Sequence, residues 1–288
     1  MGPGDDAAVV TTPDGRVVAT TDLLVDGRHF RRDWSTPYDV GRKAAAQNMA
    51  DVAAMGAVAT ALLVGLAAPP ELPAFWAERF ADGLRDECDL VGAGVVGGDV
   101  VRSDVLVLAV TALGDLQGRT PVLRSGARVG DIVAYTGRLG WSAAGFAALR
   151  RGFRSPRAVV DAHRRPEPPY AAGPVAAEAG ATSMIDVSDG LVADLGHVAQ
   201  ASGVRIEIGR AVFDIADPLV EVAAALGVDP FDWVLGGGED HALVATFPAS
   251  ASAPDGWRLI GEVTDVDPAG SVLVDGNPYS AGGFDHFA

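Results

Sequence analysis

Residues 117–131, QGRTPVLRSGARVGD, divide the chain into two parts that each alternate between strand-like and helix-like segments. This stretch is rich in Gly, Arg and Pro and lacks the periodicity of a helix or a strand, which is typical of a boundary between domains. On both sides of it, short β-rich runs are interleaved with longer runs of helical character. The pattern therefore predicts an α/β (α+β) protein with two domains, at residues 1–118 and 125–288.

The first part begins with two β-rich runs joined by Pro-Asp-Gly, so we expect a hairpin over 7–22. A helix follows over 35–57, with Ser35 or Thr36 as its cap and Pro37 in its first turn. The other elements expected there are strands at 58–67 and 104–116 and a helix at 72–91. The second part is expected to contain strands at 131–136, 183–187, 204–208, 241–247, 257–263 and 271–275, and helices at 141–151, 171–180 and 190–201.

The charge balance excludes some classes of partner. Acidic residues outnumber basic ones 38 to 22, giving a net charge of −16, and Lys43 is the only lysine. Broad binding of nucleic acid or of anionic membranes needs a positive surface, so neither is expected. The longest apolar run, residues 58–70, is too short to span a bilayer. Because the chain has a single cysteine, Cys88, and no signal-peptide pattern, the sequence favours a cytoplasmic protein without an internal disulfide.

Carboxylates recur beside glycines or near the ends of predicted elements along the whole chain. The clusters are GDD (4–6), TTD (20–22), NMAD (48–51), GGD (97–99), IDVSDG (185–190) and GGGED (236–240). Each cluster alone is equally typical of a solvated turn or a helix cap. Asp22 and Asp186, however, lie at or near the ends of apolar runs, where an unpaired charge is costly. Asn48 and Asp51 are three residues apart and therefore share one face of the predicted helix.

Several carboxylates with few basic partners indicate divalent cations. Magnesium usually takes one or two protein carboxylates and completes its octahedron with water and phosphate oxygens. A ring of carboxylates would repel a polyphosphate without metal, so a nucleotide substrate would require several ions. Arg124, in the boundary stretch, is the candidate cation for binding phosphate, although an isolated arginine is more often simply exposed. The run GAGVVG (92–97) matches a dinucleotide fingerprint, but it follows a predicted helix instead of a strand, which excludes that interpretation.

Taken together and in order, these motifs resemble those of the thiamine-monophosphate kinase family, within the superfamily of AIR synthetase and selenophosphate synthetase. The motifs are GDDAAV, TTDLLVDGRHF, NMADVAAMGA, GGD, RSGARVGD, IDVSDGL, GGGED and GGFDHF, and they run from residue 4 to the end. The resemblance implies a two-domain AIR-synthetase-like fold, with an N-terminal mixed-sheet domain that forms a homodimer and a C-terminal α/β domain. It also implies ATP-dependent phosphorylation of thiamine monophosphate to thiamine diphosphate, with several Mg2+ ions as cofactor.

The resemblance also implies which residues form the site. The magnesium ligands would be Asp6, Thr20, Thr21, Asp22, Asp51, Asp99, Asp186 and Asp189. The contacts to ATP would be Gly98, Asp99, Arg124 and Ser188, and those to thiamine monophosphate would be His29, Glu239 and Phe284. The catalytic residues among these would be Asp22, Asp51, Asp99 and Arg124.

Four residues depart from the family pattern. His241 and Ala242 stand where tyrosine and glutamate are usual, and Ala50 stands where serine is common. Tyr170 replaces the arginine that often closes the motif HRRPEPPY (163–170). Family members also usually carry a longer segment before GDD. None of these differences removes a carboxylate implied as a ligand.

The implied acceptor is a phosphate monoester, whose second pKa lies near ~6. Its oxygen is already mostly deprotonated at neutral pH, so no general base is needed and direct in-line transfer to the acceptor is the expected mechanism. Two alternatives stay open at this stage. One is another ATP-dependent enzyme of the superfamily, such as AIR synthetase, although VDGRHF and GGFDHF favour the kinase. The other is a catalytically impaired protein that only binds nucleotide or thiamine phosphates.

Overall fold

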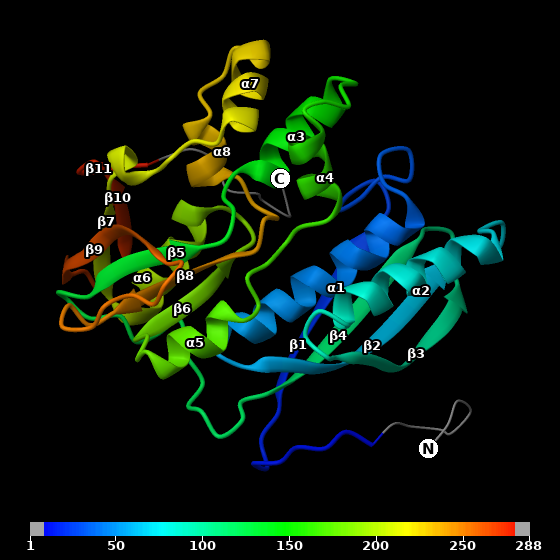
Figure 1. Ribbon diagram of the computed structural model, residues 1–288, viewed down its shortest axis with the longest axis horizontal. Helices are drawn as coiled ribbons and strands as arrows, with labels where there is room; N and C mark the ends of the chain where they lie inside the picture. Colours follow the sequence, from blue (N-terminus) through cyan, green and yellow to red (C-terminus); the bar gives the residue numbers. More distant parts are fainter. Residues whose placement is uncertain (1–8, 280–288) are drawn as a thin grey trace.

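The computed structural model describes residues 9–279 and contains two β-sheets, one on each side of the predicted boundary. The first sheet has the strand order β1-β4-β2-β3. Its strands are β1 (Val18–Val25), β2 (Val58–Ala68), β3 (Gly94–Arg102) and β4 (Val107–Asp115). The helices α1 (Pro37–Ala54) and α2 (Ala74–Cys88) cover one face of this sheet (Figure 1).

The second sheet has the order β11-β10-β7-β9-β5-β8-β6. Its strands are β5 (Ile132–Thr136), β6 (Ser183–Val187), β7 (Val204–Ile208), β8 (Ala242–Phe247), β9 (Arg258–Val266), β10 (Ser271–Val274) and β11 (Asn277–Pro278). The helices of this part are α3 (Trp141–Arg150), α4 (Arg157–Arg164), α5 (Ala172–Glu178), α6 (Leu191–Ser202), α7 (Asp217–Leu226) and α8 (Phe231–Gly236), with a 3-10 turn at Arg210–Val212. The predicted mixed α/β class, with one sheet in each part of the chain, is confirmed.

The structure differs from the predicted elements in a few places. The expected hairpin over 7–22 is wrong, because residues 9–17 form no strand and β1 pairs with β4 instead. Alternate residues of β4 are buried because α1 packs on one face of the sheet, so β1 pairs with a strand whose inner face is already part of a core. The strand β3 was not predicted, since its glycines obscure the pattern of a strand. GAGVVG lies at the start of that strand, so it cannot be the strand-to-helix turn of a dinucleotide site.

Helix α1 starts where the sequence predicts and lies between the two domains. Thr36 caps it in a reciprocal capping box with Asp39, and Pro37 occupies its first turn. On one side α1 packs against α2 and the first sheet, and on the other side it contacts β6, α4 and α5 (Figure 1). Ala53 and Ala54, at its end, belong to the same hydrophobic core as Met184 of the second sheet. The helix is therefore part of the core on both sides.

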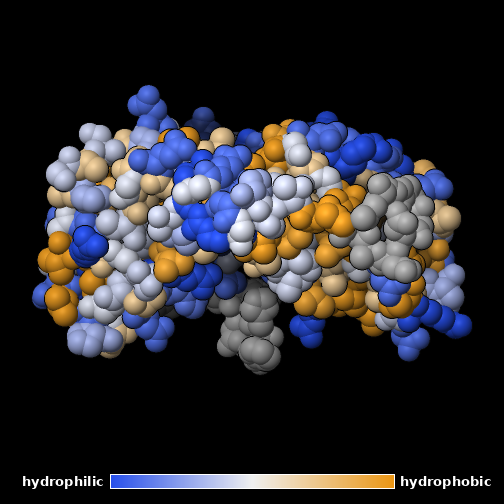
Figure 2. Space-filling view, turned by 90° about the horizontal axis from the view of Figure 1, so that it is seen from below, coloured by the Kyte–Doolittle hydropathy of each residue, from blue (hydrophilic) through white to orange (hydrophobic). Residues whose placement is uncertain are grey.

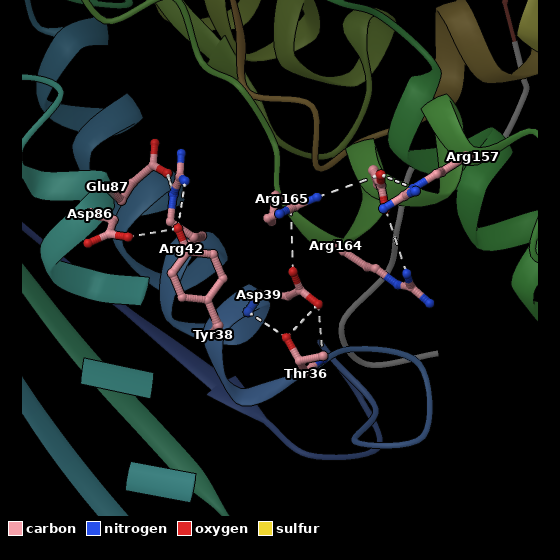
Figure 3. A network of polar contacts seen from close by, with 10 residues as sticks. Thr36, Tyr38, Asp39, Arg42, Asp86, Glu87, Arg157, Arg164 and Arg165 are labelled. Atoms are coloured by element: carbon pink, nitrogen blue, oxygen red, sulfur yellow. Dashed lines mark hydrogen bonds and ion pairs between the residues drawn. The ribbon is translucent and has the colours of Figure 1, made fainter. Parts of the chain in front are cut away.

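Polar contacts also cross between the domains. Arg165 lies 3.4 Å from Asp39 of α1, in the network of Figure 3. Arg42 of α1 bonds to Glu87 of α2, which is buried and also accepts a hydrogen bond of 2.7 Å from the hydroxyl of Tyr170. Burial and the adjacent Glu87 raise the pKa of Tyr170 well above its usual value. Tyr170, one of the four residues that depart from the family pattern, thus provides a neutral donor to the buried carboxylate of Glu87.

The other face of the first sheet carries several exposed apolar side chains beside the threonines Thr21 and Thr111. Leu23, Leu63 and Val101 lie on this outward face and are 56%, 38% and 50% exposed. Figure 2, the view from below, shows apolar side chains gathered on the half of the molecule that holds this sheet. We call Leu23, Leu63 and Val101 the outward patch.

Candidate functional site

Three polar residues of α1 meet alternate residues of β1 beneath the helix. The hydroxyl of Thr20 donates to a carboxylate oxygen of Asp51 at 2.7 Å. The backbone N–H of Asp22 donates to the side-chain oxygen of Asn48 at 3.1 Å, and Gln47 donates to the Asp22 carboxylate at 3.0 Å. The prediction that Asn48 and Asp51 share one helix face is confirmed.

Asp186 brings a third carboxylate to this place from the end of β6. It lies close enough to Asp51 for the two charges to interact, and it bonds to the ring of His241 at 3.0 Å. Burial first, and then Asp186 and Asp22, raise the pKa of Asp51 to about 7. Burial acts to lower the pKa of His241, but its bond to Asp186 raises it. The site therefore concentrates negative charge from three elements of two domains.

The loop that leads from β6 into α6 is folded around a buried carboxylate. One oxygen of Asp194 accepts hydrogen bonds from the backbone N–H groups of Ser188, Asp189 and Gly190, at 3.0, 3.0 and 3.1 Å. Burial and the adjacent Asp186 raise the pKa of Asp194 to about 7. Asp194 thus fixes Ser188 and Asp189 next to the cluster, and the sequence analysis did not single it out.

The motif GGGED forms a second loop against the first. Gly238 lies so close to the carbonyl of Ser188 that a Cβ would collide with it. The N–H groups of Glu239 and His241 donate to the carbonyls of Ser188 and Val187 at 2.9 and 3.1 Å. Glu239 and His241 have φ of +65° and +53°, which costs a non-glycine residue about 1–3 kcal/mol. These contacts hold the backbone of both residues in a conformation that a free loop would avoid.

Lys43 connects two residues that the resemblance assigns to the substrate. Its ammonium donates to the Glu239 carboxylate at 2.8 Å and to the backbone carbonyl of His29 at 3.3 Å. Glu239 and His29 are 210 residues apart in the sequence yet share this partner. Lys43 is notable in the sequence as the only lysine of an acidic chain, but its sequence context gives it no role at the site.

Three of the residues assigned to ATP or metal lie apart from the cluster. Asp99 is opposite Gly65 on β2, three strands from β1, or about 14 Å at ordinary strand spacing. Its carboxylate accepts a hydrogen bond from the N–H of Val100 at 2.9 Å. Gly98 precedes Asp99 on the same edge strand. Thr21 points to the outward face, away from Thr20, and its hydroxyl accepts a hydrogen bond of 3.0 Å from Thr111.

Arg124 is exposed and lies beside the far end of α6. Its carbonyl accepts a hydrogen bond of 3.1 Å from the hydroxyl of Ser202, the last residue of that helix. Ser188 precedes the first turn of the same helix, which at 12 residues is about 18 Å long. The structure therefore does not bring the backbones of Arg124 and Ser188 together. Asp6 and Phe284 lie outside the described residues.

The comparisons with known proteins identify the family. The model of the AIR synthase related protein N-terminal domain matches residues 4–116, and that of the C-terminal domain matches residues 128–272. Over 281 residues the chain is 55% identical to the thiamine-monophosphate kinase of Mycobacterium tuberculosis, covering 97% of this chain and 83% of that protein. The chain belongs to the thiamine-monophosphate kinase family.

Further relatives agree with this assignment. The thiamine-monophosphate kinase of Corynebacterium glutamicum is 44% identical, covering 94% of this chain and 84% of its own. A solved structure described as AaThiL complexed with AMPPCP and TMP superposes with a TM-score of 0.88 at 34% identity, covering 99% of this chain and 91% of that one. The resemblance seen in the motifs is thus confirmed over nearly the whole chain.

The residues at the junction suit the magnesium that the kinase family implies, without forming a complete site. Within residues 9–279, no group of three or more His, Cys, Asp or Glu side chains is arranged to hold a metal by itself. Thr20, Asp22, Asp51 and Asp186 nevertheless offer hard oxygen donors, and burial, with repulsion from the other carboxylates, raises the pKa of Asp51. Magnesium prefers one or two such carboxylates together with water and phosphate oxygens. The donor set fits an ion that is completed by a bound phosphate.

The hydrogen bonds of Asp194 predict a large loss of stability when its side chain is replaced by that of alanine. We expect Asp194→Ala to lower the free energy of unfolding by about 2–4 kcal/mol, because it leaves three N–H groups without their acceptor. Asp194→Asn, which keeps an acceptor oxygen, should cost less. Urea denaturation of both variants measures the effect, with exposed Asp217, also in the first turn of a helix, changed to Ala as the control. Equal losses for Asp194→Ala and Asp217→Ala would contradict this account.

Proposed function

We propose that this chain transfers a phosphoryl group from ATP to thiamine monophosphate and so forms thiamine diphosphate. The convergence of Thr20, Asp22, Asp51 and Asp186 at the domain junction, in a member of this kinase family, carries the proposal. It is supported by the relatives named thiamine-monophosphate kinase and by the similar structure described as a complex with AMPPCP and TMP.

Magnesium is part of the proposal. When bound at the junction, magnesium ions would neutralise the phosphate charges that these carboxylates otherwise repel. The proposed ligands are Asp6, Thr20, Thr21, Asp22, Asp51, Asp99, Asp186 and Asp189. Of these, Thr20, Asp22, Asp51 and Asp186 have the best support, because their hydrogen bonds and mutual electrostatic effects link them in one cluster.

The chain's own residues orient the oxygen donors before any substrate arrives. Thr20 fixes one oxygen of Asp51, and Asn48 fixes the backbone of Asp22. Preorganised donors need no rearrangement as charge develops, which favours transfer by positioning and electrostatics. Because the acceptor phosphate is mostly ionised at neutral pH, we propose direct transfer without a general base or a phosphoenzyme.

The contacts to the two substrates also stay proposals. We assign Gly98, Asp99, Arg124 and Ser188 to ATP, and His29, Glu239 and Phe284 to thiamine monophosphate. Asp22, Asp51, Asp99 and Arg124 are the proposed catalytic residues. Lys43, which bonds to both Glu239 and His29, supports a shared substrate role for these two.

A side-by-side assay tests the reaction. The purified chain is given ATP and Mg2+ with thiamine monophosphate, with thiamine, or with the substrate of AIR synthetase, and the products are separated by chromatography. We expect thiamine diphosphate from the first alone. A ring-closed product from the third would favour AIR synthetase. Binding of ATP and thiamine monophosphate without turnover at saturating Mg2+ would favour the impaired binder.

The same assay tests the role of Asp51. We expect Asp51→Asn to lower kcat by about 10²–10³-fold. The change removes a negative charge that would hold magnesium ions beside the transferring phosphoryl group. The change keeps the side-chain volume, so circular dichroism and the unfolding midpoint should stay close to those of the unchanged protein. Exposed Asp89, changed to Asn, is the control and should keep full activity. Near-normal turnover of Asp51→Asn at limiting Mg2+ would contradict the proposed cluster.

A homodimer is proposed as well, with the outward patch as its interface. Leu23, Leu63 and Val101 are exposed on one face of the first sheet, whereas α1 and α2 cover the other. Exposed apolar patches of this kind usually mark contact surfaces. We expect Leu63→Lys to shift the mass in solution from dimer to monomer, measured by light scattering. Val220→Lys, on exposed α7, is the control, and an unchanged dimer in Leu63→Lys would contradict this interface.

A cytoplasmic location completes the proposal. Within residues 9–279, none of the helices has both the length and the apolar character to cross a membrane. Cys88 is a free thiol, and burial raises its pKa to about 11, which disfavours the reactive thiolate. A buried unpaired cysteine suits a reducing compartment.

A further inference from the structure

Lys43 is buried among acceptors that use its whole hydrogen-bonding capacity. An ammonium has three N–H donors. Besides Glu239 and the carbonyl of His29, the group lies 3.4 Å from the carbonyl of His163, so each donor has an acceptor. The Lys43 side chain is only 3% exposed. It is therefore not free to bind a phosphate of the substrate.

The three acceptors come from three separate segments. His29 follows β1 in the first domain, His163 is in α4, and Glu239 is in the loop before β8. The N–H of Val25 donates to the ring of His29 at 3.0 Å, so the ring and the backbone of His29 are both held. A single ammonium thus fixes the spacing between two loops of different domains.

His163 is packed so that it contributes a carbonyl and no charge. Its ring contacts Trp34 and Phe146, with centroids 6.3 and 5.6 Å apart, and bonds to the hydroxyl of Ser142 at 3.1 Å. Burial, and then the adjacent Lys43, lower the pKa of His163 to about 3, so the ring is neutral at physiological pH. Lys43 is consequently the charged group that donates a hydrogen bond to Glu239, although the neutral ring of His163 lies 3.7 Å from the same carboxylate.

The side chain of Glu239 is bonded to Lys43 but is not fully buried. Its side chain is 38% exposed, although the lysine it bonds to is buried. Burial acts to raise the pKa of Glu239, but Lys43 lowers it to about 2. A carboxylate that stays ionised and is partly exposed suits a cationic organic group, and the thiazolium ring of thiamine monophosphate is one.

We propose that Lys43 is a positioning residue for thiamine monophosphate, which holds the Glu239 carboxylate and the His29 loop at a fixed spacing across the domain junction. This inference rests on the proposed substrate contacts of Glu239 and His29. It assigns Lys43 to the organic part of the acceptor and not to ATP or to the metal cluster. Lys43 itself touches neither substrate.

Binding of thiamine monophosphate alone tests the proposal, measured by titration calorimetry without ATP or Mg2+. We expect Lys43→Met to weaken this binding by about tenfold or more, because Glu239 loses its charged hydrogen bond and its orientation. In turnover assays the KM for thiamine monophosphate should rise likewise, whereas the KM for ATP should change by less than about twofold. Lys43→Arg, which keeps the charge, should recover part of the affinity.

Tyr170→Phe is the matched control. It removes another buried hydrogen bond across the domain junction, to Glu87, without touching His29 or Glu239. We expect it to lower the unfolding midpoint and leave the affinity for thiamine monophosphate unchanged. A purely structural defect would weaken the binding of both substrates in proportion to the loss of stability. If Lys43→Met does this, the proposal is wrong. Unchanged affinity in Lys43→Met overturns it too.

A double-mutant cycle separates this inference from the substrate assignment on which it rests. Glu239→Gln should weaken binding by itself, and if it does not, the proposed contact of Glu239 is wrong whatever Lys43 does. If Glu239→Gln weakens binding, Lys43→Met should add little in the double variant, because the two residues act as one unit. Independent, additive losses would overturn the role of Lys43. The double variant lacks the unpaired carboxylate, so it also serves if Lys43→Met alone does not fold.

Discussion

The burial of α1 between two domains is the constraint on which the rest of the structure depends. A helix covered on both sides cannot leave its polar groups to water, so each needs a partner in the protein. Asp39 meets Arg165, Arg42 meets Glu87, and Lys43 meets Glu239. Arg42 and Lys43 are adjacent on α1, and Asp39 lies about one turn before them. The same requirement that joins the domains therefore also brings charged groups to their junction.

Further along α1 the pattern of pairing changes, and with it the chemistry that the junction offers. Lys43 and Glu239 balance each other, and the ionised carboxylate stays partly exposed. Asp51 instead has carboxylates as neighbours, and these raise its pKa together with burial. The two residues are eight positions apart on α1, or about 12 Å. One end thus suits an organic cation and the other suits metal-bound phosphate, which matches the two ends of thiamine monophosphate.

The sequence predicts those parts that depend on short-range pattern. Thr36 and Pro37 mark the start of α1, and the spacing of Asn48 and Asp51 places both on one face. The prediction of a hairpin over 7–22 fails because strand propensity does not reveal which strand is the partner, and the partner of β1 is β4. Gly98 and its neighbours conceal β3, since glycine has low strand propensity.

The pairings that build the site could not be predicted in this way. Lys43 and Glu239 are 196 residues apart, and Asp186 and His241 are 55 apart. No local pattern links such residues, because their contact exists only after both sheets and the junction have formed. Asp194 is closer to its partners, but its carboxylate turns back toward the N-terminus of α6, where a solvated helix residue is the commoner expectation. Uncommon residue types, such as the single lysine, are the better guide to such contacts.

The strained loop at GGGED connects the Lys43–Glu239 contact to the acidic cluster around Asp186. Glu239 and His241 are separated by one residue, and both have positive φ. Glu239 is held by Lys43, and His241 is held by Asp186 of the acidic cluster. Asp240 lies between them. Its carboxylate accepts a hydrogen bond of 2.8 Å from the N–H of Ser142 at the start of α3. With three consecutive side chains each tied to a different element, the loop cannot relax at one end alone. The contacts of these side chains therefore link the organic and the phosphate ends of the proposed substrate site, and they hold a loop whose backbone is strained at Glu239 and His241.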